Sequence, residues 1–90
     1  MYIEIDVHHG DGVEEAFYLT NRVCTLSFHE FGDNFFPKTG GLNSIGDGEG
    51  RYHKINVPLR PGITDEKYYS LFKTISSAAI DSFRPSAIIF

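Results

Sequence analysis

The feature that most constrains the fold is a series of apolar, β-branched runs separated by turn residues and helical patterns. The runs read "YIEIDV", "RVCTLSFH", "YHKINVPL" and "SAIIF". The first, residues 2–7, has the density of Ile and Val that is typical of a strand buried on both faces, as in parallel sheets. The order strand, helix, strand, loop, strand, helix, strand predicts an α/β fold with a mostly parallel sheet and helices on its faces.

The first helix is expected in "GDGVEEAFYLT". Asp11 and Glu14 have the spacing of a capping box, in which each side chain bonds to a backbone N–H of the first turn. We expect this short helix to end at Thr20 and Asn21. The remaining acid, Glu15, is expected to face solvent.

The second helix is expected over residues 64–83. Thr64 can cap its first turn, where Asp65 and Glu66 favour the helix dipole, and Arg84 with Pro85 should end it. Its apolar face at helical spacing comprises Tyr69, Phe72, Ile75, Ala79, Ile80 and Phe83. Between the second and third strands, residues 29–50 are rich in Gly and Asn yet hold several Phe, which predicts an ordered functional loop.

Composition narrows the class of protein. Ninety residues allow one domain, and the apolar runs at both ends resemble interior strands, so we expect a piece of a larger sheet. The net charge of −4 and scattered basic residues do not favour nucleic-acid binding. Cys24 is the only cysteine, and no apolar run is long enough to span a bilayer, so a soluble intracellular protein is expected.

A possible chemical site lies where the first run meets a turn, in "IDVHHGDG". If the strand continues, Asp6 and His8 project from the same face, and a carboxylate with an imidazole suits zinc. Open α/β sheets bind ligands at this end of their strands. The alternative is an ordinary hydrogen-bonded turn. His9 could support such a site or simply pack, and Asp11 could orient a catalytic group or only cap the helix.

Taken together, these stretches resemble a class I zinc-dependent histone deacetylase. The resemblance rests on "YIEIDVHHGDGVEEAFY", on "FHEFGDNFFPKTGG" with the "GDGEGRY" that follows it, and on "RPSAIIF". It covers all 90 residues and implies that residues 1–90 are a central segment of the catalytic domain, with the three-layer arginase/deacetylase architecture. Asp11 and the pair of acids after it separate this run from class II relatives.

The resemblance implies that Asp6 and His8 are two of three zinc ligands. It assigns to Asp11 and Glu4 the carboxylates that orient two catalytic histidines located upstream, and to His9 a supporting role. Those histidines, the third metal ligand and an oxyanion-stabilising Tyr are absent from this chain, so these residues alone should not catalyse deacetylation.

The resemblance also implies two monovalent cation sites, whose hard oxygen ligands suit potassium. The first would use the side chains of Glu4 and Ser27 and the backbone oxygens of Asp6, His8 and Phe28. The second would use mainly the carbonyls of Phe17, Thr20, Val23 and His53. Phe36 matches an aromatic wall of the acetyl-lysine tunnel, although it could equally anchor the loop in the core.

Three positions depart from the family pattern. Glu4 replaces an Asp, which lengthens a carboxylate that must fit both a cation and a histidine. Lys38 replaces a Gly at the tunnel rim, and His53 replaces a Tyr.

The function implied is zinc-dependent hydrolysis of acetyl-lysine on histone tails and other proteins, in the nucleus and also in the cytoplasm, within corepressor complexes. No membrane or direct nucleic-acid partner is expected. The alternatives are a non-catalytic deacetylase-like scaffold or truncated gene product, which Glu4 and the short chain favour, and a small-molecule amide hydrolase, which Asp11 disfavours.

Overall fold

Three parallel strands form the centre of the structure, a computed structural model that describes all 90 residues. They are β1 (Tyr2–Glu4), β2 (Thr25–Glu30) and β3 (Lys54–Leu59), side by side in that order. The register pairs Glu4 with Ser27 and Ser27 with Asn56. The expected α/β fold with a parallel sheet is confirmed.

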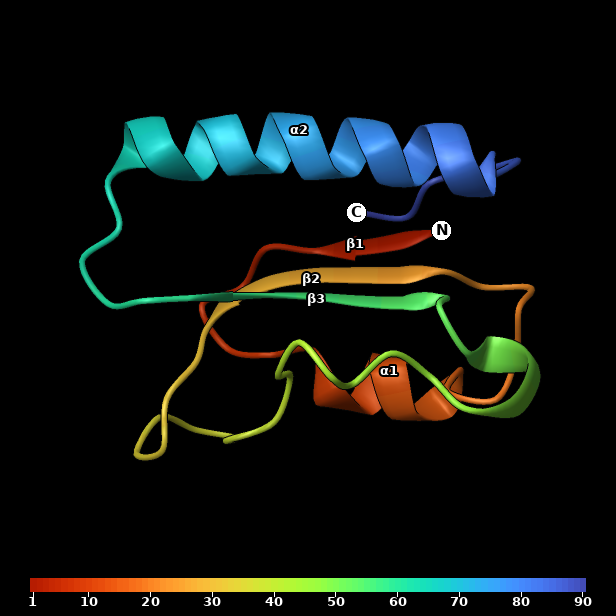
Figure 1. The fold of residues 1–90 in the computed structure, drawn as a ribbon, viewed down its shortest axis with the longest axis horizontal. Coiled ribbons are helices and arrows are strands. Elements are labelled where there is room, and N and C mark those ends of the chain that lie inside the picture. The colour runs from red at the N-terminus through yellow and green to blue at the C-terminus, as the bar shows by residue number, and fades with distance from the viewer.

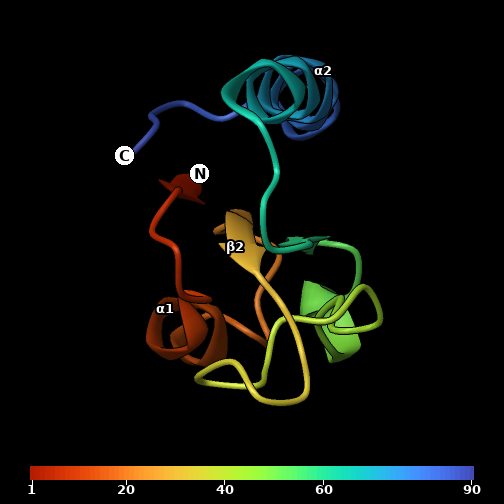
Figure 2. The ribbon, with the colours of Figure 1, turned by 90° about the vertical axis from the view of Figure 1, so that its left-hand side faces the viewer.

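The other elements cover both faces of the sheet (Figure 1). Helix α2 (Asp65–Phe83) runs along one face, whereas α1 (Asp11–Ala16), the long loop and the 3-10 turn η1 (Gly48–Gly50) lie on the other. Figure 2 shows the same three layers end-on. Neither helix combines the length and apolar character needed to cross a membrane.

The C-terminal apolar run forms less strand than expected. Ile89 makes one parallel bridge with Tyr2, and its carbonyl accepts a hydrogen bond of 2.9 Å from the N–H of Ile3. The run therefore lies beside β1, on the side away from β2. The chain crosses one face from β1 to β3 and returns over the other face through α2, so the strand order reverses at β1. Ligands of open α/β sheets bind at the carboxyl ends of strands at such a reversal.

The two faces of the sheet differ in polarity because side chains of β2 alternate. Leu26 and Phe28 face α2, where the Phe28 ring lies 5.2 Å from the ring of Phe72 and 6.0 Å from that of Tyr68. The opposite face buries polar side chains from β2 and β3 beneath α1 and the loop. This polar layer comprises Thr25, Ser27, His29, Lys54 and Asn56.

Helix α1 starts one residue earlier than a cap at Asp11 implies, and the predicted capping box was wrong. Its N-cap is Gly10, and no side chain caps it. Asp11 Oδ1 instead accepts a hydrogen bond of 2.8 Å from the N–H of Gly12. Glu14 points into the sheet, where buried donors bind its carboxylate. The helix ends at Ala16, earlier than the expected Thr20 and Asn21.

Helix α2 has the expected ends. The hydroxyl of Thr64 accepts a hydrogen bond of 3.3 Å from the N–H of Lys67, and Arg84 closes the helix in a left-handed conformation. The predicted apolar face was wrong at one residue. Tyr69 is 67% exposed, and Tyr68 contacts the core instead. Residue 68 precedes Phe72 by four positions, so it shares that face, whereas residue 69 is rotated away.

Candidate metal centre

Asp6 and His8 follow β1 in a bend, so the expected strand through Val7 was wrong. Oδ1 of Asp6 accepts a hydrogen bond of 2.8 Å from the backbone N–H of His8. Local bonds of this kind compete with strand pairing. The hydrogen-bonded turn is therefore real, yet it also brings the side chains together, with Nδ1 of His8 3.3 Å from Oδ1 of Asp6.

This pair fits part of a zinc site. Zinc binds carboxylate oxygen and imidazole nitrogen at about 2.0–2.2 Å, so two ligands on a tetrahedral ion lie roughly 3.3–3.5 Å apart. The Nδ1 to Oδ1 separation of 3.3 Å lies in that range, and the side chains of His8 and Asp6 are 48% and 59% exposed. The chain contains no group of three or more His, Cys, Asp or Glu side chains placed to hold a metal.

Two aromatic rings from the long loop surround His8. Phe35 stacks on the imidazole with ring centroids 5.3 Å apart, and Phe36 meets its edge at 5.7 Å. Phe36 is 72% exposed, so it does not anchor the loop in the core. Its ring lies beside the proposed ligand, at the rim of the site.

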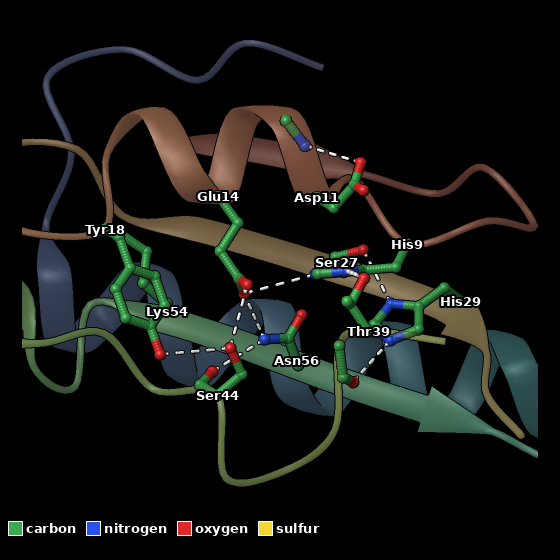
Figure 3. A network of polar contacts seen from close by, with 12 residues as sticks. His9, Asp11, Glu14, Tyr18, Ser27, His29, Thr39, Ser44, Lys54 and Asn56 are labelled. Carbon is green, nitrogen blue, oxygen red and sulfur yellow. Dashed lines mark hydrogen bonds and ion pairs between the residues drawn. The ribbon is translucent and has the colours of Figure 1, made fainter. Parts of the chain in front are cut away.

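His9 is buried beneath α1 (Figure 3), whereas the side chain of His8 is 48% exposed. Its Nδ1 lies 2.8 Å from the hydroxyl of Thr39, and its Nε2 lies 3.4 Å from a carboxylate oxygen of Glu14. His9 thus joins the segment that carries His8 to both the long loop and α1. That contact supports a positioning role.

Glu14 is the centre of the buried polar contacts in Figure 3. Its carboxylate accepts hydrogen bonds from the Ser44 hydroxyl at 3.0 Å and from the side-chain amide of Asn56. The same amide donates to the Ser44 carbonyl at 2.8 Å. Glu14 therefore ties α1, the long loop and β3 together, and the prediction that it serves only as a cap was wrong.

His29 extends the polar layer toward the carboxyl end of β2. Its Nε2 lies 2.7 Å from the Gly40 carbonyl, which can only accept, so Nε2 carries the proton. In the neutral ring Nδ1 then accepts from the Ser27 hydroxyl, 2.9 Å away. Burial lowers the pKa of His29 below its usual range, although the Gly40 carbonyl opposes this. The ring is therefore a neutral bridge between β2 and the loop.

The remaining carboxylates assigned to catalysis are partly accessible. Asp11 is exposed at the start of α1, and only the bond to the Gly12 N–H engages its side chain. Glu4 accepts a hydrogen bond of 2.8 Å from the Tyr2 hydroxyl and lies against Gly10, where an added Cβ would approach Glu4 Oε2 to 2.9 Å. This bond to Glu4 raises the pKa of the Tyr2 phenol.

The first set of cation-site residues lies on β1, on β2 and in the bend that follows β1. Glu4 and Ser27 are register partners on β1 and β2, but the hydroxyl of Ser27 contacts His29 and the carboxylate of Glu4 contacts Tyr2. Phe28 would contribute only its carbonyl oxygen, and its buried ring packs on the α2 side.

The second set gathers around a side chain that the sequence did not point to. The ammonium of Lys54 donates to the carbonyls of Thr20 at 3.1 Å, Val23 at 2.8 Å and His53 at 3.1 Å. The Phe17 carbonyl instead accepts from the N–H of Thr20. Burial lowers the pKa of Lys54. Because its ammonium already uses three of the four expected carbonyls, this arrangement does not fit a potassium ion.

Comparison with known proteins identifies the family. The histone deacetylase domain matches residues 1–90, the whole chain. This chain belongs to the histone deacetylase family. It is 57% identical to histone deacetylase 9 of Arabidopsis thaliana and 55% identical to human histone deacetylase 1, in each case over 99% of its own length. It covers 21% and 18% of those relatives, about a fifth of their length. Rice histone deacetylase 2 is 57% identical over the same share of the chain, which covers 17% of that relative.

The resemblance to class I histone deacetylases is therefore confirmed, whereas the buried polar layer was missed. The sequence predicted Glu14 only as a cap and indicated no role for Asn56 or Lys54. The signal available in the sequence was the alternation in "TLSFH" and "KINVPL", which places polar side chains on one face. Alternation does not show whether the polar face of the strands is exposed to solvent. In this structure α1 and the long loop cover that face.

Proposed function

We propose that the full-length gene product hydrolyses acetyl-lysine on histone tails and other proteins, as a zinc-dependent deacetylase. The observation that carries the proposal is the convergence of His8 Nδ1 and Asp6 Oδ1 at 3.3 Å, at the end of β1 where the strand order reverses. Membership of the histone deacetylase family supports it. Nuclear and cytoplasmic location, histone substrates and corepressor subunits as partners belong to the same proposal.

In this proposal Asp6 and His8 hold the metal, and His9 fixes the segment that carries them. Zinc bound there would polarise the acetyl carbonyl and lower the pKa of a water molecule. Phe36 offers an apolar wall for the alkyl stem of the substrate lysine, because its ring is exposed beside His8. Asp11 presents an exposed carboxylate able to orient an imidazole from elsewhere in the protein.

The test is release of acetate from an acetyl-lysine peptide by the full-length gene product, with and without a zinc chelator. Asp6→Ala and His8→Ala should each lower kcat/KM by more than about 100-fold, since even indirect supports of a metal are worth 10–100-fold. Asp81→Ala, at an exposed position on α2, is the matched control and should retain activity. A folded protein that releases no acetate would contradict the proposal.

A non-catalytic scaffold is the second candidate, and the bond between Glu4 and Tyr2 favours it. That bond engages one oxygen of the carboxylate that the resemblance assigns to orienting a histidine. Glu4→Asp in the full-length protein separates the two candidates. If the wild-type protein is inactive and Glu4→Asp releases acetate, the lost activity is due to Glu4. If the wild-type protein itself releases acetate, the scaffold candidate is excluded.

A further inference from the structure

Lys54 lies in an environment that is unusual for a lysine. The residue is 1% exposed, yet no carboxylate lies within ion-pair distance of its ammonium. Fully buried lysines are rare unless they are paired with an acid. Here backbone carbonyls replace the acid, and three of them match the three protons of the ammonium.

The carbonyls come from two separate parts of the chain. Thr20 and Val23 belong to the turn between α1 and β2, and His53 precedes β3. The carbonyls of Thr20 and Val23 accept no other hydrogen bond, while that of His53 also accepts from the N–H of Thr25 at 3.1 Å. Without Lys54, the carbonyls of these two half-buried residues would have no hydrogen-bond donor and no positive charge beside them.

Convergent backbone carbonyls are the ligand set with which proteins replace the hydration shell of potassium. We propose that Lys54 is a tethered cation that takes the place of a monovalent ion in the cage formed by the Thr20, Val23 and His53 carbonyls. The second ion site implied by the family resemblance is then filled by this chain itself. The turn before β2 stays locked to β3 whether or not potassium is present.

The direct test is ion occupancy in crystals of the full-length gene product grown with thallium(I) in place of potassium. The wild-type protein should show no anomalous thallium peak at the three carbonyls. Lys54→Ala should show one, because the variant leaves both the carbonyls and the space vacated by the side chain. A thallium peak at these carbonyls in the wild type, with Lys54 displaced, would overturn the proposal, and this measurement needs no variant to fold.

Thermal unfolding supplies a second readout, with potassium compared against tetramethylammonium at equal ionic strength. In tetramethylammonium, Lys54→Ala should lower the midpoint by roughly 5 °C, and potassium should restore about half of that loss. Lys54→Met is the matched variant: it fills the cage without charge, so it should lose stability without recovery in potassium. Lys73→Ala, exposed on α2, should change neither value.

Failure of potassium to stabilise Lys54→Ala, with no thallium bound, would show that the cage does not bind ions and would contradict the proposal. Both readouts are independent of acetate release. The proposal on Lys54 therefore stands or falls separately from the deacetylase function.

Discussion

At the carboxyl end of β1, Asp6 and His8 are about half exposed and contact each other, and His8 also contacts the rings of Phe35 and Phe36. The polar layer beneath α1 is instead buried and extensively hydrogen-bonded. Glu14 alone binds Ser44 and Asn56 and contacts His9. In the proposed function, the lone pairs of Asp6 and His8 would bind a metal. The polar layer uses its atoms to hold α1, the long loop and the sheet together. Substitutions in the layer should therefore lower stability, whereas substitutions of Asp6 and His8 should lower activity.

The largest loss of stability should come from Glu14→Ala in the full-length protein. The variant leaves buried donors on Asn56 and Ser44 without their acceptor, which should cost about 3–4 kcal/mol in the free energy of unfolding. Denaturant unfolding measures it. The neighbouring Glu15→Ala, at an exposed position, should stay within about 0.5 kcal/mol. Equal losses of stability in the two variants would show that the buried polar layer does not stabilise the fold more than an exposed position does.

Gly40→Ala should rank second, at about 2–4 kcal/mol. Gly40 has φ of +88°, and an added Cβ would lie 2.4 Å from His29 Nε2 and 2.6 Å from His9 Cγ. Gly62→Ala is the matched control because Gly62 has φ of +81° and open space around it. It should show only the backbone cost of about 1 kcal/mol. If Gly40→Ala costs no more than Gly62→Ala, the rings of His29 and His9 move aside without a measurable loss of stability.

Lys38→Gly, in the long loop, should raise the free energy of unfolding slightly. Lys38 has φ of +70°, a left-handed conformation that glycine adopts without steric cost. After the greater chain entropy of glycine is subtracted, a gain of up to about 1 kcal/mol is expected. Chemical denaturation of the variant checks it, with exposed Lys73→Gly, inside α2, as a contrast that should destabilise. Destabilisation by Lys38→Gly would show that the lysine side chain holds the turn.

The smallest effect on stability is expected for His8→Ala, within about 0.5 kcal/mol when zinc is absent, because the side chain is half exposed. The same variant should bind zinc much more weakly than the parent, which calorimetry with added zinc measures. A loss of several kcal/mol in the metal-free protein would show that the stacking of His8 on Phe35 is structural, and would remove the contrast with Glu14.

Several parts of this architecture followed from sequence alone because they depend on local patterns. The density of β-branched residues predicted the strands, and Thr64 with the spacing of Phe72, Ile75 and Ala79 predicted α2. The same reasoning failed for Tyr69, since helical spacing allows more residues on a face than the sheet can cover. It also extended β1 through Val7, although the strand ends at Glu4 and the Asp6 carboxylate accepts a hydrogen bond from the His8 N–H.

The sequence by itself determined the strand and helix order, the apolar face of α2, and the Asp6 and His8 pair as a metal candidate, because each is encoded within a few neighbouring residues. Only the tertiary structure decided that Glu14 binds Asn56, 42 residues away, and that Lys54 binds the carbonyl of Val23, 31 residues away. The sequence pattern of polar side chains along a strand does not distinguish an exposed face from a buried one. Its role depends on which distant segment covers it and which atoms that segment presents.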